Sequence, residues 1–450
     1  MYDPLAHPQL SPNQPYPESF WAFNTGKRLH FPQLEATVQT EVVIIGAGFT
    51  GLSAAIALRE KGVETALVEA NSVGWGCAGR NAGFALPGSG RLGFSALKSA
   101  YGKNAAIGII SEYYQAVDNL KHFIDSNNLQ VDLVQGGYLK IASKAKDINL
   151  FEQQLNDLPS TYASKLSLLS AQEVDTHFIE THQQFGGLYN SSSFGINPLK
   201  MALAMAELAR ENGAHVFQNS PVLSYEKAQN ASHGKRYVVT TTKGKIYCDH
   251  IILATNAYTP NKSLPVFYRA QFPVLSSVLV THPLRDEQLK FVKQAGLMCM
   301  DTRALKYYYR LLPGNRILFG GRGAVWGYNH DSPLIKRKLI NALKSSFPNL
   351  DDARIDYFWS GWVSVSQDEI PHIGSLPSDP NIHFAMGYCG SGVAFTHTAG
   401  KRLAQLVTSK NDVPELPIYN TFPKDFPFAP FRRLGLWGYY QWQSLMDWVS

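Results

Sequence analysis

Residues 42–69 read VVIIGAGFTGLSAAIALREKGVETALVE, and this stretch decides the fold. The apolar residues Val42–Ile45 predict a buried strand, and the Ala- and Leu-rich run Gly51–Lys61 predicts a helix. Thr65–Val68 predicts a second strand, which ends at Glu69. A strand, a tight turn, a helix and a second strand in this order form the βαβ unit that binds dinucleotides.

Gly46, Gly48 and Gly51 have the G-x-G-x-x-G spacing between the first strand and the helix. In such a unit the first glycine permits the tight turn, the second lets a pyrophosphate approach the backbone, and the third lets helix and strand pack closely. The helix N-terminus offers unpaired N–H groups to the phosphates. Glu69 can accept hydrogen bonds from both hydroxyls of an adenosine ribose and would repel a 2′-phosphate. The sequence therefore predicts a dinucleotide site.

A second glycine-rich turn lies near the other end of the chain. Residues 386–393 read MGYCGSGV, and a helix is predicted over 394–406. Glycines before a helix again form a backbone cradle for an anion or an oxygen atom. A nicotinamide enzyme needs only the first unit, whereas a flavoprotein with two dinucleotide-binding elements has one near each end. The two turns together favour FAD.

The composition is that of an ordinary globular enzyme. Hydrophobic residues make up 45% of the 450 residues, which suffices for the core of two or three domains. The net charge of +6 is small for this length and no run of Lys and Arg occurs, so we expect no nucleic-acid partner.

The spacing of the cysteines and the length of the apolar runs indicate in which cellular compartment the protein is expected. The four cysteines are far apart and form no C-x-x-C pair, which argues against a zinc site or a disulfide framework and fits a reducing compartment. No signal peptide is evident, and no apolar run approaches the roughly 18 residues of a membrane span. We expect a cytoplasmic protein without membrane contact, in which the aromatic segment Phe426–Trp448 packs onto the FAD-binding part rather than onto a membrane surface.

The predicted fold is mixed α/β. We expect a two-dinucleotide-binding-domain FAD fold, Rossmann-like and discontinuous, with an antiparallel-sheet substrate or cap domain. An extended arm is expected over 1–38, and the FAD-binding domain over 39–85, 186–262 and 357–450. The cap domain is expected over 86–185 and 263–356, where several stretches predict strands.

The order of motifs resembles that of the D-amino-acid oxidase, glycine oxidase and sarcosine oxidase superfamily of FAD-dependent amine oxidoreductases. Within it, the chain is most similar to the gamma-glutamylputrescine oxidoreductase branch, from about Trp21 to the C-terminus. The resemblance rests on the segments IGAGFTGLS (45–53), GRNAG (79–83), GGY (136–138), YYRL (308–311), GG (320–321), WSG (359–361), GYCGSGV (387–393) and THTAG (396–400).

The resemblance implies oxidation of a carbon–nitrogen bond in a small amine, with a hydride passing to flavin N5 and the resulting imine hydrolysing. The flavin supplies this chemistry, while the protein orients the carbon and excludes water. The resemblance also implies, by position, the residues that contact FAD. They are Gly46, Gly48, Phe49, Thr50, Gly51, Glu69, Ala70, Arg80, Asn81, Ala82, Gly83, Val222, Ala254, Thr255, Gly390, Ser391, Gly392 and Val393.

The substrate side departs from the relatives. Several amino-acid oxidases of the superfamily hold the substrate carboxylate with an arginine shortly after the Trp-x-Gly strand, but residues 359–364 here read WSGWVS. An amine whose charged group lies far from the reacting carbon, such as an acylated diamine, fits better. Arg310 or Arg322 could still hold a charged group from neighbouring strands.

The candidate catalytic residues are Tyr309 and Arg310. Tyr307, Tyr308 and Tyr309 lie in a predicted strand, where alternate side chains face opposite sides. Either Tyr308 or the pair Tyr307 and Tyr309 therefore faces the pocket, and we expect Tyr309 to do so.

The electron acceptor and other functions stay open. Sarcosine-oxidase-like members have an oxygen-activating lysine where this chain has Val325, and members with covalent flavin have a cysteine near the position of Gly361. We therefore expect non-covalent FAD and, as acceptor, oxygen or another carrier. Alternatives are an oxidase or dehydrogenase of glycine, sarcosine or a D-amino acid, and a flavoprotein that modifies a protein or peptide partner.

Overall fold

Strand β2 (Val42–Ile45) lies inside a six-stranded sheet of the computed structural model, which describes residues 1–26, 29–88, 90–228, 234–261 and 264–449. The strand order is β19-β20-β13-β2-β3-β9, and every neighbouring pair is parallel except β19 with β20. The other strands are β3 (Thr65–Val68), β9 (His215–Phe217), β13 (His250–Leu253), β19 (His372–Leu376) and β20 (Asp379–Met386). Parallel sheets are covered on both faces, and every residue of β2 and β3 is accordingly buried.

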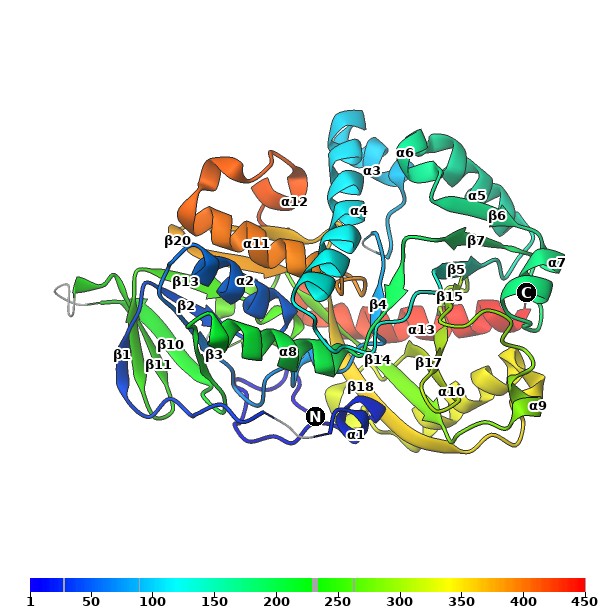
Figure 1. Ribbon diagram of the computed structural model, residues 1–450, viewed down its shortest axis with the longest axis horizontal. Coiled ribbons are helices and arrows are strands. Elements are labelled where there is room, and N and C mark those ends of the chain that lie inside the picture. The colour runs from blue at the N-terminus through cyan, green and yellow to red at the C-terminus, as the bar shows by residue number, and fades with distance from the viewer. Residues whose placement is uncertain (27–28, 89, 229–233, 262–263, 450) are drawn as a thin grey trace.

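Helices cover one face of this sheet and a second sheet covers the other (Figure 1). Val42 and Ile44 pack among the helices α2 (Phe49–Glu60), α8 (Pro198–Glu211) and α11 (Phe395–Thr408). Val43 and Ile45 point the opposite way, toward a four-stranded sheet. Its strands are, in order, β1 (Thr37–Gln39), β12 (Lys245–Cys248), β11 (Tyr237–Thr241) and β10 (Val222–Lys227).

An eight-stranded, mostly antiparallel sheet forms the other half of the molecule (Figure 1). Its strands are, in order, β18 (Ile355–Val365), β14 (Phe272–Thr281), β17 (Arg316–Arg322), β16 (Tyr308–Leu312), β15 (Met298–Asp301), β5 (Tyr138–Ile141), β7 (Gly187–Asn190) and β6 (Leu166–Leu169). Only β5 and β15 pair in parallel within this sheet. A short separate pair joins β4 (Phe84–Ala85) to β8 (Phe194–Gly195).

The remaining helices follow the sequence signals closely. Asn197 caps α8, because its side chain accepts hydrogen bonds from the N–H groups of Leu199 and Lys200. The other helices are α1 (Phe20–Asn24), α3 (Phe94–Tyr101), α4 (Lys103–Ser126), α5 (Lys146–Asp157), α6 (Ser160–Ala163), α7 (Ala171–Glu173), α9 (Asp286–Leu289), α10 (Pro333–Ser346), α12 (Pro417–Asn420) and α13 (Arg432–Val449).

The mixed α/β fold with its separate antiparallel sheet confirms the predicted fold class. Strands β7 and β18 belong to the eight-stranded sheet, although their residues fall in ranges expected for the FAD-binding domain. They do so because β18 pairs with β14 along most of its length and β7 pairs with β5. The expected boundary between residues 262 and 263 lies outside the described residues, and the domain limits stay a prediction.

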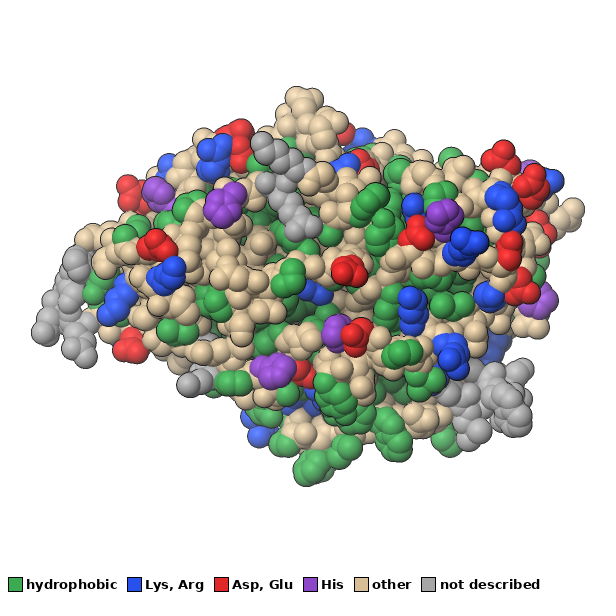
Figure 2. Space-filling model, turned by 90° about the horizontal axis from the view of Figure 1, so that it is seen from below, with side chains coloured by type: hydrophobic (Ala, Val, Ile, Leu, Met, Phe, Trp, Pro, Cys, Tyr) green, Lys and Arg blue, Asp and Glu red, His purple; other side chains and the backbone are tan. Residues whose placement is uncertain are grey.

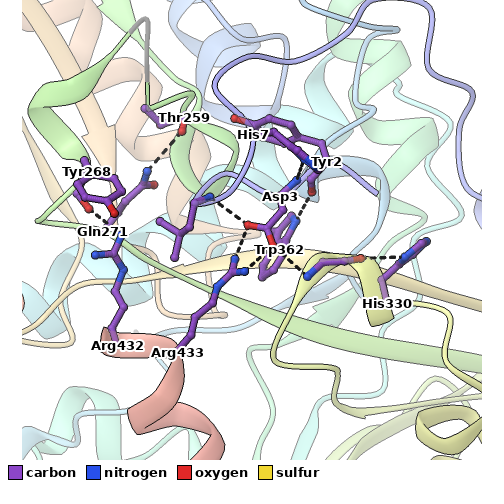
Figure 3. Close-up of polar contacts among 12 residues, drawn as sticks. Tyr2, Asp3, His7, Thr259, Tyr268, Gln271, His330, Trp362, Arg432 and Arg433 are labelled. Atoms are coloured by element: carbon purple, nitrogen blue, oxygen red, sulfur yellow. Dashed lines mark hydrogen bonds and ion pairs between the residues drawn. The ribbon is translucent and has the colours of Figure 1, made fainter. Parts of the chain in front are cut away.

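The C-terminal helix α13 is held against the body by the start of the chain (Figure 3). The guanidinium group of Arg433 donates to both carboxylate oxygens of Asp3, which also accepts from the N–H of Gly327. Burial acts to raise the pKa of Asp3, but Arg433 and the backbone donors outweigh it and hold this pKa below its usual value. The indole N–H of Trp362 donates to the carbonyl of Tyr2 at 2.7 Å and fixes the same segment.

The surface mixes charges of both signs. Figure 2 shows Lys and Arg side chains scattered among acidic ones on one face of the molecule, without a broad area of one sign. Large apolar side chains are exposed on α13 and just before it, namely Phe428, Phe431, Leu434, Trp437 and Trp442. In the described part of the chain, no helix is long and apolar enough to cross a membrane.

The crossing of α2 and α11 generates the first prediction. A Cβ on Gly400 of α11 would lie 2.5 Å from Ser53 Cβ and 2.7 Å from Thr50 O, both on α2. We expect Gly400→Ala to destabilise the protein by about 1–3 kcal/mol through overpacking. The measurement is the thermal unfolding midpoint. The matched control is Gly438→Ala on α13, where no described atom outside the helix's own nearby backbone lies within 4 Å of the added methyl group. Equal midpoints for the two variants would contradict this account of the crossing.

Candidate active site

A cavity of about 1010 Å³ extends from the C-terminal ends of β2 and β3 to one face of the eight-stranded sheet. Ile45 and Val68 lie at one end of it, and Tyr138 and Met300 lie at the other. Sites for small molecules usually measure about 300–1,000 Å³. A cavity at the top of this range can hold a dinucleotide together with a small substrate.

The first glycine turn meets the cavity at the N-terminus of α2. Gly46 has φ +110°, a conformation that favours glycine, and its Cβ would lie 2.9 Å from Ala254 O. A Cβ on Gly51 would lie 2.0 Å from Gly46 O, so this glycine lets α2 pack on β2. Gly48 is the N-cap, no side chain caps it, and the first turn of α2 carries no acid. The helix end thus leaves N–H groups and a positive dipole end for an anion.

The carboxylate of Glu69 lies beside this turn. Its oxygens accept hydrogen bonds from Ala47 N at 2.9 Å and from Asn71 N at 3.0 Å. Burial raises the pKa of Glu69, and these backbone donors only partly offset it. The two hydrogen bonds hold the side chain at the cavity, where each oxygen retains lone pairs for a further donor.

The glycine-rich loop after β3 is fixed by its own polar side chains. Arg80 donates to Trp75 O at 2.8 Å and to Ser360 O at 3.1 Å, and its guanidinium lies 4.6 Å from the centroid of the Trp75 ring. The amide of Asn81 donates to Cys77 O and Ala78 O, both at 3.0 Å. These contacts place a rigid loop along one side of the cavity.

The second glycine-rich turn lies next to the first. The hydroxyls of Tyr388 and Thr50 are 2.8 Å apart, which ties this turn to the start of α2. Gly387, Cys389 and Gly390 all have positive φ, and the non-glycine Cys389 has φ +54°. Burial raises the pKa of the Cys389 thiol, and it raises that of Cys77 to about 11. Both thiols are therefore protonated at neutral pH.

One face of the eight-stranded sheet forms the far wall of the cavity. Side chains alternate along each strand, so every second residue faces the cavity. Lining residues with this spacing are Tyr138 and Lys140 of β5, Leu188 and Asn190 of β7, Met300 of β15, Tyr308 of β16, Arg322 of β17, Phe272, Val274, Ser276 and Val278 of β14, and Gly361, Val363 and Val365 of β18. Leu166 of β6, Gly321 of β17 and Ser364 of β18 also line the cavity.

The prediction that Tyr309 faces the pocket is wrong. Tyr309 is buried on the opposite face of the sheet, where its ring stacks on Phe319 and meets Phe347 edge-on. Tyr308 lines the cavity instead, and its hydroxyl lies 2.8 Å from Ser276 Oγ. Burial raises the pKa of Tyr308 to about 12, so this phenol keeps its proton at neutral pH.

Arg310 does not line the cavity either. It shares a sheet face with Tyr308, but β4 and β8 cover it. Its guanidinium donates to Ile196 O at 2.6 Å, and a Cβ on Gly83 would lie 2.9 Å from its Nη2. Burial lowers the pKa of Arg310 to about 9. Arg310 therefore supports the glycine-rich loop from behind and is not among the residues that line the cavity.

Most residues assigned to FAD do meet at the cavity, although they come from distant segments. Gly51 and Gly83 are exceptions: they lie in close backbone contacts just behind the wall. The residues that line it are Gly46, Gly48, Phe49, Thr50, Glu69, Ala70, Arg80, Asn81, Ala82, Val222, Ala254, Thr255, Gly390, Ser391, Gly392 and Val393.

Sequence reasoning missed the cap-side residues Tyr138, Lys140, Lys306 and Tyr440. In the strand YLKI, Leu139 and Ile141 are apolar and buried, and this alternation could have indicated that Tyr138 and Lys140 face the cavity. No sequence signal indicates that α13 forms a wall, yet Leu436, Tyr439 and Tyr440 line the cavity. No cluster of three potential metal ligands occurs among the described residues.

Comparison with known proteins agrees with this geometry. Residues 41–406 match the family model described as DAO, FAD dependent oxidoreductase. The chain is 29% identical over 416 residues to gamma-glutamylputrescine oxidoreductase of Escherichia coli (strain K12), and the match covers 92% of this chain and 94% of that protein.

Solved structures show the same fold. Glycine oxidase from Geobacillus kaustophilus aligns with a TM-score of 0.69 at 16% identity, covering 85% of this chain and 99% of that one. L-proline dehydrogenase from P. horikoshii aligns with a TM-score of 0.68 at 19% identity, covering 86% and 96%. Because the family match spans most of the chain, this protein belongs to the DAO family of FAD-dependent oxidoreductases.

Proposed function

We propose that this enzyme oxidises a carbon–nitrogen bond of a small amine of the gamma-glutamylputrescine type. When bound, FAD accepts a hydride at flavin N5, and the imine product hydrolyses in water. The observation that carries the proposal is the continuous cavity, which joins the α2 N-terminus to the inner face of the eight-stranded sheet. It offers room for a dinucleotide at one end and for a substrate at the other.

We propose that the residues around the first turn hold the FAD diphosphate and adenosine. The N–H groups at the α2 N-terminus suit the phosphates, Glu69 suits the ribose hydroxyls, and Val222 flanks the adenine. Arg80 and the turn at Gly390–Val393 lie along the same cavity and suit the flavin end. The fit is supported by Gly48, where a side chain would project into the cavity.

The part of β18 that follows Trp359 supports a substrate without a carboxylate next to the reacting carbon. Its residues on the cavity lining are Gly361, Val363, Ser364 and Val365, none of which carries a positive charge that could pair with a carboxylate. An acylated diamine keeps its charged groups at the far end from the reacting amine. The printed name of the Escherichia coli relative points to the same kind of substrate.

The walls of the cavity favour the neutral form of the amine. Apolar walls remove water from an ammonium group and so lower its pKa. Val274, Val278 and Val363 supply such a wall on the sheet, and Leu436 supplies one on α13. The protonated Tyr308 hydroxyl can orient the nitrogen by a hydrogen bond, and with its pKa near 12 it does not serve as a base.

The first test follows flavin bleaching under anaerobic conditions. We expect gamma-glutamylputrescine to bleach the visible flavin band, and glycine, sarcosine and D-alanine to bleach it far more slowly. Readmission of air then shows whether oxygen restores the colour quickly. Bleaching by the amino acids alone would contradict the proposed substrate class, and bleaching by none of the four compounds would contradict the proposed reaction.

A second test addresses the phosphate cradle. In the protein alone, a methyl group on Gly48 would meet only Ala78 Cβ at 3.7 Å. We expect Gly48→Ala to leave the apoprotein folded but to raise the Kd of FAD about 10- to 100-fold, because overpacking costs about 1–3 kcal/mol. FAD titration of the deflavinated protein measures this, with Gly438→Ala as the control. An unchanged Kd would remove Gly48 from the proposed cradle.

A third test addresses the flavin linkage. We expect acid precipitation to release all flavin into the supernatant, because the Cys77 and Cys389 thiols are protonated and protonated thiols are poor nucleophiles. Absorbance of the supernatant and the pellet measures the partition. A covalent link would be shown by two results together: the wild-type pellet stays yellow, and the pellet of Cys77→Ser or Cys389→Ser is colourless.

A further inference from the structure

We propose that the cap side of the cavity is a carboxylate-binding subsite in which Lys306 and Arg322 contact the anion directly. The subsite rests on the proposed function, and it identifies the substrate as an amine with a carboxylate remote from the oxidised bond. The two cations would orient the substrate by its acidic end and leave its amine toward the flavin.

The charges around the cavity are strongly unbalanced. Among the described residues that line it, Glu69 is the one carboxylate, and it lies at the α2 end. The basic residues on the lining are Arg80, Arg91, Lys140, Arg303, Lys306, Arg322 and Arg432. An enclosed space with so many cations attracts an anionic ligand.

Five of these cations are already engaged by the protein. Arg91 pairs with Glu369 at 2.9 Å, and Arg303 pairs with Asp301 at 3.5 Å. Arg80 and Arg432 donate to backbone carbonyl oxygens. Lys140 lies over the ring of Phe151 at 5.3 Å. Within the described ranges, no ion pair joins Lys306 or Arg322 to a carboxylate.

Lys306 and Arg322 also lie close together. Tyr308 of β16 is opposite Gly320 of β17. Lys306 comes two residues before Tyr308 and Arg322 two residues after Gly320, and the charge of Arg322 acts on Lys306. Ser276 is the partner of Arg322 on the next strand, β14, and it lines the cavity as well. The two cations thus face the same space from adjacent chain segments, with a hydroxyl beside them.

The electrostatics indicate that this pair lacks a counterion. Burial and the neighbouring cations Lys140, Arg91 and Arg322 lower the pKa of Lys306 to about 8, although Asp301 acts in the opposite direction. Asp301 is occupied, because it accepts from the backbone N–H groups of Arg303 and Tyr307. A bound carboxylate would relieve the repulsion among the cations.

A hydroxyl on α13 completes the subsite. Tyr440 lines the cavity, and its buried hydroxyl has no hydrogen-bond partner among the residues that the structure describes. The charges of Arg322 and Arg91 act on this phenol, which locates it on the same side of the cavity. A phenol O–H that points to an anion is a good donor, and a buried donor without a partner is costly. Tyr440 thus adds a neutral donor to the two cations.

A pair of amines that differ in the carboxylate tests the proposal. gamma-Glutamylputrescine carries it, whereas N-acetylputrescine has the same aminobutyl group and no acid. We expect Arg322→Gln and Lys306→Met to raise the KM of gamma-glutamylputrescine about 10- to 100-fold, the usual effect of losing a charge-assisted hydrogen bond. The limiting rate of flavin reduction, and the KM of N-acetylputrescine, should change less than about 3-fold.

The matched control is Arg303→Gln, which removes a charge from the same wall but from a residue already paired with Asp301. It should leave both KM values nearly unchanged. Equal effects of Arg322→Gln on the two amines, or an effect of Arg303→Gln as large as that of Arg322→Gln, would overturn the subsite.

Glutarate separates failure of the subsite from failure of the proposed reaction. It is a dicarboxylate without an amine, and its binding is read from the absorbance of the oxidised flavin. Glutarate binding that is lost in Arg322→Gln supports the subsite even when no amine is oxidised. A different result would contradict the subsite but not the proposed reaction. In that case the wild-type protein oxidises gamma-glutamylputrescine, yet it does not bind glutarate and it binds gamma-glutamylputrescine no more tightly than N-acetylputrescine.

The pH dependence of glutarate binding provides an independent readout. Lys306 is cationic below its pKa of about 8, so affinity for glutarate should be full below this pH and fall as pH rises above it. Arg322 and Arg91 are further cations that act on Lys306, and the pKa of Asp301, which burial raises to about 6, lies well below this range. Because Lys140 also faces Lys306, Lys306→Arg is the control. This variant should still bind glutarate tightly, and its affinity should no longer decrease above about pH 8. If the affinity of Lys306→Arg still decreases above this pH, Lys306 is not part of the subsite.

Discussion

The close contact between helix α2 and strand β2 is the constraint on which the rest of the molecule depends. A side chain at Gly51 would collide with Gly46 O, and a side chain at Gly400 of α11 would collide with Ser53 and with Thr50 O of α2. Both contacts fix where α2 begins, and its N-terminus therefore points into the cavity. Any widening of these contacts would move the helix end away from the phosphates that it can bind.

The cofactor half of the cavity could be predicted from sequence because its signals are local. Glycine spacing, apolar strand runs and the acid after β3 each follow from the conformation of a few neighbouring residues. Most of the residues predicted there line one cavity, although they come from both ends of the chain. Gly51 and Gly83 were assigned as contacts but support the wall from behind.

The substrate half could not be predicted in the same way. Tyr307, Tyr308 and Tyr309 are identical residues, so no alternation of polar and apolar side chains indicates which of them faces the cavity. The choice depends on Phe319 and Phe347, which enclose Tyr309 from β17 and from the end of α10. Likewise, Lys306 and Arg322 become neighbours only through the pairing of β16 with β17. Contacts of this kind join distant segments and cannot be predicted from a short stretch of sequence.

The ion pair between Asp3 and Arg433 joins the first residues of the chain to the helix that walls the cavity. Tyr439 and Tyr440 stand on that helix within two turns of the ion pair. Loss of this segment, or a neutral residue in place of Asp3, would therefore disturb a wall of the cavity rather than a remote surface. Versions of this protein that are prepared for binding studies should keep the segment intact.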